Sequence, residues 1–461
     1  MFRRIAFTLT IVSVSLFSLA ASNPVPLIYQ PLSPTSVAPG HSAFTLTVRG
    51  SNFVSGAVIK ANGIPLKTKF VNRRTLQAAI SEKVVEKPGT ASITVANPGS
   101  IDSNVIYFTV REPSTSVAVT TDSATIEGGY VAVGDFNNDH KPDIAVANIN
   151  TVDTYLNAGK ANFSKIAGPA YTQNVMFPPF IVADFNNDGN LDVAPCGGDG
   201  GPDPTTCDIY FGDGKGNLTL DNYQWVYAGV MADVNGDGIL DNIAVWGDGY
   251  QSYLSISLGN GDGTFASATT VPTAVPGLPV IGDFNGDGKL DVATSVEGYE
   301  IPGPGTVAVF LGNGDGTVQP EVDYQTPWGG YYAAVADING DGKLDIITGG
   351  FSVLMGKGDG TFAVGTSTLL RGSSNTAVQM VDVNGDGKLD LVTQGTHSQS
   401  VPSLAVLLGN GKGAFQTPIL LPPSTSGLNT FGIADFNNDG LLDFAIGGGT
   451  QSTVLLQAPS N

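Results

Sequence analysis

The stretch Asp283-Phe284-Asn285-Gly286-Asp287-Gly288-Lys289-Leu290-Asp291 decides how this chain folds. Its spacing, D-x-N-x-D-x-x-x-D, occurs seven times, and the first residues of successive copies are 49, 49, 50, 54, 45 and 53 positions apart. This regular spacing indicates one structural unit that is repeated through residues 112–461. We number the copies loops 1 to 7: Asp135–Asp143, Asp184–Asp192, Asp233–Asp241, Asp283–Asp291, Asp337–Asp345, Asp382–Asp390 and Asp435–Asp443.

The nine positions of a loop are readable as a set of hard-cation ligands. Carboxylate or amide oxygens at positions one, three and five converge when the chain coils tightly. Position six must turn sharply and is Gly in six copies. Position seven varies freely, as a backbone carbonyl ligand allows, and position nine is always Asp. Oxygen donors that include about three carboxylates select calcium over transition metals, so we predict up to seven Ca²⁺ ions.

The predicted calcium ligands occupy positions one, three, five, seven and nine of each loop. They are Asp135, Asn137, Asp139, Lys141, Asp143, Asp184, Asn186, Asp188, Asn190, Asp192, Asp233, Asn235, Asp237, Ile239, Asp241, Asp283, Asn285, Asp287, Lys289, Asp291, Asp337, Asn339, Asp341, Lys343, Asp345, Asp382, Asn384, Asp386, Lys388, Asp390, Asp435, Asn437, Asp439, Leu441 and Asp443.

Two loops depart from the pattern. In loop 1, His140 replaces the turn glycine and Pro142 replaces leucine, so its calcium site is the weakest of the predictions. In loop 3, Asn242 follows the final aspartate and is interpreted as an extra residue that forms a β-bulge. An EF-hand would need Glu at the twelfth position of the loop, and no copy has one.

The sequence around the loops indicates strands. An apolar run precedes each loop and another follows it, for example Tyr130 to Val133 and Ile144 to Val146. A third strand and a weaker fourth complete each unit of about 50 residues. Four strands per unit, seven times, predict a seven-bladed β-propeller in an all-β chain.

These repeats resemble the FG-GAP/VCBS family, which builds the propeller of the integrin α-subunit. The resemblance covers residues 112–461 and implies calcium at each matching loop. Closure of the ring follows from the chain ends. The last repeat lacks a fourth strand, and Ser116 to Thr120 has no place in the first repeat. We expect that segment to supply the missing outer strand, which leaves no open edge.

Residues 23–111 form a different unit. Residues 24–111 hold nine Lys and Arg against three acidic residues, and short alternating strands such as Phe44 to Arg49 predict a β-sandwich. The runs Thr45 to Phe53 and Pro88 to Gly99 resemble the IPT/TIG family of Ig-like domains. That resemblance implies a spacer or interaction domain without chemistry of its own.

Composition bounds the location and the partners. The first 21 residues pair Arg3 and Arg4 with an apolar run, which predicts a signal peptide rather than a membrane anchor, and no other run could span a membrane. The protein is therefore expected outside the cell or on its surface, as a monomer.

The net charge of −20 argues against nucleic acid as a partner. Residues 112–461 hold 38 acidic residues against ten basic ones, an excess that bound calcium would reduce.

The two cysteines, Cys196 and Cys207, predict a disulfide in the oxidising compartment, and a catalytic thiol is the alternative.

Sequence reasoning leaves several functions open: a glycan- or protein-binding adhesion module, a polysaccharide-active enzyme, or a structural surface protein. No nucleophile or zinc motif favours the enzyme. Aromatic residues on the face opposite the loops either bind a ligand or pack between blades. The candidate ligand face comprises Tyr171, Tyr223, Trp225, Trp246, Tyr250, Trp328 and Tyr331.

Overall fold

The computed structural model describes residues 23–171, 175–198, 205–247, 251–297, 304–365, 375–397, 401–422, 430–449 and 451–458. Within them the chain is all-β, apart from one 3₁₀ helix, η1 (Glu82–Val85). No helix in these ranges is long and apolar enough to cross a membrane. The predicted signal peptide lies outside the described residues.

The N-terminal residues form two sheets that share one core. The first contains β1 (Leu27–Ser33), β3 (Phe44–Ser51), β7 (Thr75–Ile80) and β6 (Thr68–Asn72). The second contains β2 (Ser36–Val37), β9 (Ile106–Val110), β8 (Gly89–Ala96), β4 (Val58–Ala61) and β5 (Ile64–Pro65). Leu46 and Val48 of β3 pack in the same buried cluster as Ile93 and Val95 of β8. Alternate residues of each strand therefore face the partner sheet, as the period of two predicted.

In the described residues that follow, the strands form seven four-stranded antiparallel sheets, which we number 1 to 7. Sheet 1 has β11 (Tyr130–Gly134), β12 (Asp143–Ala147), β13 (Val152–Asn157) and β14 (Phe163–Ile166); sheet 2 has β15 (Val175–Ala183), β16 (Asp192–Gly198), β17 (Thr206–Gly212) and β18 (Leu218–Tyr227); sheet 3 has β19 (Gly229–Ala232), β20 (Asp241–Gly247), β21 (Ser252–Ser257) and β22 (Thr269–Thr273). Sheet 4 has β23 (Val280–Gly282), β24 (Asp291–Glu297), β25 (Gly305–Phe310) and β26 (Val322–Thr326); sheet 5 has β27 (Ala333–Ala336), β28 (Asp345–Thr348), β29 (Val353–Gly356) and β30 (Phe362–Val364). Sheet 6 has β31 (Asn375–Val381), β32 (Asp390–His397), β33 (Val401–Leu407) and β34 (Ile419–Leu420); sheet 7 has β35 (Phe431–Ala434), β36 (Asp443–Ile446), β37 (Gln451–Ala458) and β10 (Ala118–Glu127).

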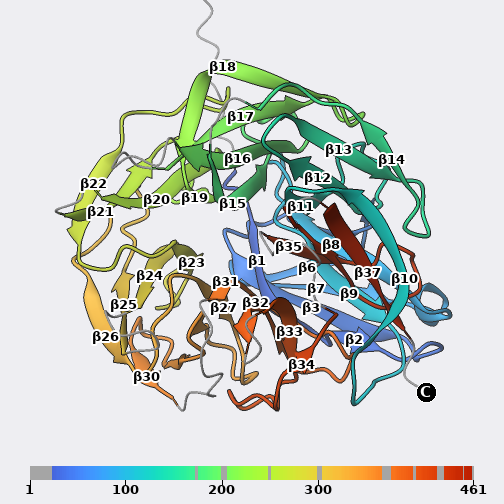
Figure 1. Cartoon of the computed structure of the whole chain (residues 1–461). Coiled ribbons are helices and arrows are strands. Elements are labelled where there is room, and N and C mark those ends of the chain that lie inside the picture. Colours follow the sequence, from blue (N-terminus) through green and yellow to red (C-terminus); the bar gives the residue numbers. More distant parts are fainter. Residues whose placement is uncertain are drawn as a thin grey trace, which may run out of the picture.

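The sheets stand around a central axis with their first strands innermost, the arrangement of a β-propeller (Figure 1). From sheet 1 up to sheet 6, successive first strands contact one another, and β35 of sheet 7 contacts β11 of sheet 1. Each hydrophobic cluster lies between two successive sheets; one, for example, joins Phe284 of sheet 4 to Ile346 of sheet 5. The core is thus a set of interfaces between sheets, so no sheet buries its apolar face alone.

The ring closes through the two ends of the repeat region. Strand β10 pairs antiparallel with β37, from Ala118 opposite Ala458 to Glu127 opposite Gln451. This is the closure that the sequence predicted, although the closing strand extends further along the chain than Thr120. Because β10 covers the outer edge of β37, the backbone of the last strand is paired on both sides.

Candidate metal loops and a candidate ligand face

Each loop joins the first and second strands of its sheet, so all seven lie at the same end of the ring. The backbone takes a left-handed conformation at position six, as at Gly288 (φ 87°), where a side chain would be strained. Position four is left-handed as well, as at Gly286 (φ 75°) and Asn187 (φ 60°). Sequence reasoning missed this second turn; the signal was that only Asn or Gly occurs at position four.

Side-chain oxygens hold the loop backbone from inside. In loop 2 the N–H of Asp188 donates to Oδ1 of Asp184 and to Oδ1 of Asn186, both at 3.1 Å. The N–H of Gly189 donates to Oδ2 of Asp184 at 2.8 Å, and that of Asn190 donates to Oδ1 of Asp188 at 2.8 Å. The oxygens of positions one, three and five are therefore turned inward in one tight coil.

The aspartate at position nine ties three segments of its sheet together. In sheet 4, Oδ2 of Asp291 accepts the N–H of Phe284 at 2.8 Å, and Oδ1 accepts the N–H of Gly312 at 2.8 Å. Equivalent pairs of hydrogen bonds occur at position nine of every loop. This carboxylate is fully buried, so it joins the loop to the end of the third strand independently of any ion.

Burial makes the negative charge at position nine costly. It raises the pKa of Asp291 to about 7, against the opposing effect of the N–H groups of Gly312 and Phe284. The neighbouring charges of Asp283 and Asp287 raise that pKa further. The same causes raise the pKa of Asp443 to about 8. A cation in the loop would relieve both the desolvation and the repulsion between carboxylates.

Two loops also hold a carboxylate oxygen without a partner. Oδ1 of Asp283 and Oδ1 of Asp337 lie in residues that are only 5% and 4% exposed and have no donor at good hydrogen-bond geometry, although the backbone N–H groups of Gly286 and Asp341 are close enough to lower the pKa of the two carboxyl groups. Such an oxygen is expensive unless a donor or a cation meets it. In the described part of the chain, no three Asp, Glu, His or Cys side chains converge as a preformed metal site. The donor set of the loops fits a hard cation, which would have to draw the carboxylates together.

Loop 1 keeps the backbone hydrogen bonds of loop 2, although His140 replaces the turn glycine. His140 takes a left-handed conformation (φ 65°), and its Nδ1 lies 3.6 Å from Oδ2 of Asp135. Its ring lies against Gly63, in the turn between β4 and β5, where a Cβ atom would have no room. The first residue of loop 1, Asp135, is more exposed than the first residue of any other loop. The side chain of His140 therefore packs against the N-terminal sheets.

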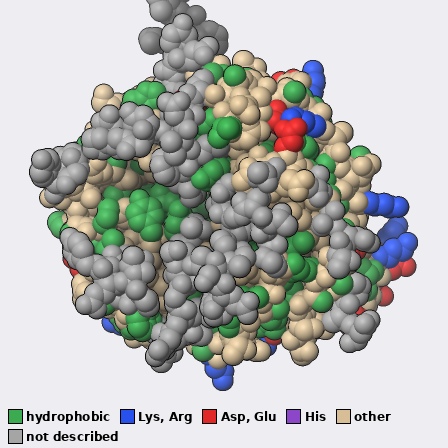
Figure 2. Space-filling model, viewed as in Figure 1, with side chains coloured by type: hydrophobic (Ala, Val, Ile, Leu, Met, Phe, Trp, Pro, Cys, Tyr) green, Lys and Arg blue, Asp and Glu red, His purple; other side chains and the backbone are tan. Residues whose placement is uncertain are grey.

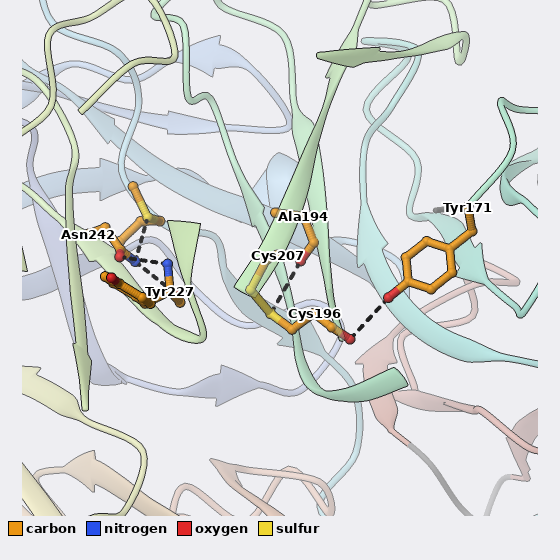
Figure 3. Close-up of a disulfide and its surroundings, with 7 residues drawn as sticks. Tyr171, Ala194, Cys196, Cys207, Tyr227 and Asn242 are labelled. Carbon is orange, nitrogen blue, oxygen red and sulfur yellow. Dashed lines mark hydrogen bonds between the residues drawn. A yellow bond between two sulfur atoms is a disulfide. The ribbon is translucent and has the colours of Figure 1, made fainter. Parts of the chain in front are cut away.

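The predicted bulge in loop 3 is wrong. Strands β19 and β20 pair in continuous register, with Met231 opposite Asn242 and Ala232 opposite Asp241. Asn242 is not an added residue, because it occupies the place that Val292 holds in sheet 4. Its side-chain amide bonds instead to the backbone of Tyr227 in the neighbouring sheet (Figure 3).

Cys196 and Cys207 form a disulfide across β16 and β17, where the two residues are directly opposite each other (Figure 3). The hydroxyl of Tyr171 donates to the carbonyl of Cys196 at 3.2 Å, and the side chain of Tyr171 is only 7% exposed. Tyr171 is therefore a core residue, and its assignment to the ligand face is wrong. Cys207 pairs with Val226 of β18, between Trp225 and Tyr227, so the disulfide holds β17, which is paired with the strand that carries these two aromatic residues.

A row of four aromatic rings crosses from sheet 2 to sheet 3. Trp225 and Tyr227 meet edge to face at 5.2 Å between centroids. Tyr227 stacks on Trp246 at 6.0 Å, and Trp246 lies 5.1 Å from Tyr253. We call these four residues the aromatic row. They lie at the strand ends opposite the loops, because Trp246 is the last residue but one of the strand that Asp241 begins.

The aromatic row reaches the surface at one end. Trp225 is 51% exposed, whereas Tyr227, Trp246 and Tyr253 are half-buried. On the face seen in Figure 2, hydrophobic side chains gather in a patch near the sheet 3 side of the ring. Away from the row, Tyr331 is 45% exposed and packs edge to face on Tyr332, and Trp328 is half-buried. Tyr250 and the side chain of Tyr223 lie outside the described part.

Comparison with known proteins gives a family match within the repeats. The model of the FG-GAP-like repeat matches residues 112–194, 233–294 and 283–348. No curated protein matches the chain.

Solved structures resemble the chain only weakly. An auxiliary nutrient binding protein from Bacteroides ovatus shares 12% identity over 94% of this chain and 98% of its own, with a TM-score of 0.34. A second such protein, from Bacteroides thetaiotaomicron, shares 10% identity over 95% and 99%, with a TM-score of 0.31. The Dos1 propeller shares 9% identity over 94% of each chain, with a TM-score of 0.40. These scores carry no functional argument, and the chain is an all-β protein with FG-GAP-like repeats in three places.

Proposed function

We propose that this chain is a secreted, calcium-binding, seven-bladed β-propeller behind an IPT/TIG Ig-like domain, and that it is a non-catalytic binding or adhesion module. Its ligand would be an extracellular glycan or protein, bound at the aromatic row. The seven sheets are the blades, and the two N-terminal sheets are the Ig-like sandwich.

The observation that carries the binding function is the exposure of Trp225 at the end of the aromatic row. An exposed indole costs free energy in water, and aromatic faces bind the apolar faces of sugars and protein anchors. Asn242 and the Cys196–Cys207 disulfide hold the strands beneath the row, so its geometry is set before a ligand arrives.

The calcium function is supported by the unpartnered oxygens of Asp283 and Asp337 and by the buried charge at position nine. Positions one, three, five and nine of each loop would supply side-chain oxygens, and position seven would supply its carbonyl. A bound Ca²⁺ would neutralise part of the charge of three carboxylates and stabilise the folded chain by mass action.

Binding at the aromatic row is tested with a glycan array and the mature chain in calcium, followed by titration of the best hit. We expect Trp225→Ala to weaken binding at least tenfold. Tyr331→Ala is the control, because it removes an aromatic residue of similar exposure, 45% against 51% for Trp225, outside the row. A hit that both variants bind as well as the wild type would remove the aromatic row from the proposal. Turnover of the hit would overturn the non-catalytic assignment.

A further inference from the structure

The N-terminal sheets contact the metal loops themselves. The N–H of Val25 donates to Oδ2 of Asp233, the first residue of loop 3, at 2.9 Å. In loop 4, the N–H of Asp283 donates to the hydroxyl of Tyr29 at 2.9 Å, and Nη1 of Arg74 lies 3.9 Å from Oδ2 of Asp283. We call residues 25–111 the cap.

Loops 5 and 6 receive their own donors from the cap. Nη1 of Arg49 donates to Oδ2 of Asp337 at 3.2 Å, and the N–H of Asp337 donates to the carbonyl of Gln30 at 3.0 Å. Oγ1 of Thr35 donates to Oδ2 of Asp382 at 2.7 Å. Four consecutive loops thus have their first aspartate held by the cap, and each of these aspartates is less than a tenth exposed.

The cap and an ion would use different oxygens of the same carboxylate. The arginines of the cap, Arg74 and Arg49, contact Oδ2 of Asp283 and of Asp337. Oδ1 of each aspartate is buried and has no donor at good hydrogen-bond geometry. A cation that met Oδ1 would not displace the arginine from Oδ2. Holding one oxygen fixes the rotamer of the side chain and so presents the other, which is how outer contacts tune a metal ligand.

The positive charges of the cap and of the ion can both be balanced by the aspartates of one loop. The three aspartates of a loop carry three negative charges, and a divalent ion leaves one of them uncompensated. Arg49, which pairs with Asp337 of loop 5, and Arg74, which pairs with Asp283 of loop 4, each supply one positive charge to that remainder. The basic excess of residues 24–111 complements the acidic repeats in the same sense.

Loop 2 lacks this support. Among the described residues, no hydrogen bond or ion pair joins the cap to loop 2. Asp184, Asp188 and Asn190 of that loop line a cavity of about 2130 Å³ whose lining also includes Asn104 and Val105 of the cap. Asp184 is itself only 8% exposed, and Asp233 of loop 3 lines the same cavity, so what separates loop 2 from loops 3 to 6 is that none of its described residues bonds to the cap.

We propose that the cap is the outer support of the calcium ions in loops 3 to 6, and that ion binding and cap docking strengthen each other. Loop 2, which is uncapped, releases its ion faster than the capped loops. This inference rests on the proposed calcium function, because without bound ions there is nothing to couple. By reciprocity, the factor by which the cap raises calcium affinity is the factor by which calcium tightens the cap.

The test uses the full mature chain, stripped with a chelator and reloaded with Ca²⁺. Equilibrium dialysis counts the ions, and stopped-flow mixing with a fluorescent chelator gives their release rates. We expect a fast phase and a slow phase, and Asp188→Asn in loop 2 should remove one ion from the fast phase. Thr35→Val with Arg49→Met should speed the release of two slow ions about tenfold. Arg73→Met is the control, since this exposed arginine makes no ion pair with a loop in the described residues.

The outcomes separate the two proposals. No bound calcium in the wild type would overturn the calcium function. Calcium that binds normally, with release from the Thr35→Val, Arg49→Met variant equal to that from Arg73→Met, would overturn the cap alone. Hydrogen exchange of the wild type tests the coupling without any substitution, so a folding defect in a variant cannot affect this result. We expect calcium to slow exchange in β1 and β3, and equal exchange with and without calcium would also overturn the coupling.

Discussion

The side-chain amide of Asn242 forms two hydrogen bonds with the backbone of Tyr227 in the neighbouring sheet: Nδ2 donates to the carbonyl at 3.1 Å, and Oδ1 accepts the N–H at 3.2 Å. Tyr227 sits in the middle of the aromatic row, between Trp225 and Trp246. A single polar residue in an otherwise apolar position thus joins sheets 2 and 3 beneath the candidate ligand face (Figure 3).

Replacing Asn242 by leucine should destabilise the protein, although leucine-like residues occupy this position in other sheets. Asn242 is 2% exposed, and its loss leaves a partly buried N–H and carbonyl unpaired, at a cost of about 2 kcal/mol. Chemical denaturation measures the change. Asn260→Ala is the control, because its amide bonds only to the exposed Oγ1 of Thr264 and should cost little. Equal effects of the two substitutions would contradict the bridging role.

The position-nine aspartates should be needed even in the absence of calcium. Asp291→Asn replaces one acceptor oxygen by an NH₂ group that faces the N–H of Phe284 or Gly312. We expect a loss of about 2 kcal/mol in the free energy of unfolding, measured with excess chelator. Asp287→Asn is the control, since Asp287 accepts only exposed donors: an amide retains the Oδ1 that meets the N–H of Lys289 and gives up only the exposed bond from Asn285 to Oδ2. An unchanged chelator-treated Asp291→Asn variant would mean that position nine serves the ion alone.

The disulfide should contribute measurably to stability. Cys196 and Cys207 are 11 residues apart, and closing a loop of this size stabilises the fold by about 3 kcal/mol in the chain-entropy model. The double substitution Cys196→Ala, Cys207→Ala should lower the melting temperature by several degrees. Reductant should produce a similar loss in the wild type and none in the double variant. A reductant effect in the double variant would show that the loss does not come from this bond.

Closure of the ring should depend on β37, which pairs with both β10 and β36. Val454 in this strand is fully buried, so Val454→Asp would place an unpaired charge between sheets 7 and 1. We expect a loss of at least about 3 kcal/mol in thermal or chemical unfolding. Val364→Asp, the same change at an exposed valine of the outer strand β30, should change stability by less than about 0.5 kcal/mol. A stable Val454→Asp variant would show that the seam between first and last sheets tolerates opening.

Much of the fold could be read from local patterns. The repeat of Asp283–Asp291 fixes the pitch of the sheets, because each copy marks one turn between two strands. The alternation in Phe44 to Arg49 fixes which residues of β3 face the core, since side chains alternate across a strand. The closing strand was predictable from a count: the last repeat was one strand short, and the segment after Arg111 had one too many.

The candidate sites were less predictable, because they depend on residues far apart in the chain. The sequence by itself determined the number of loops, their oxygen donors and the turn at position six, since these follow from spacing and backbone sterics within nine residues. Only the tertiary structure decided that Tyr171 is buried and that Asn242 reaches Tyr227. The tertiary structure alone also placed Arg49 against Asp337 and Thr35 against Asp382, which are 288 and 347 residues away along the chain. Contacts of that kind arise when a ring closes and a second domain docks on it, and no local pattern encodes which surfaces then meet.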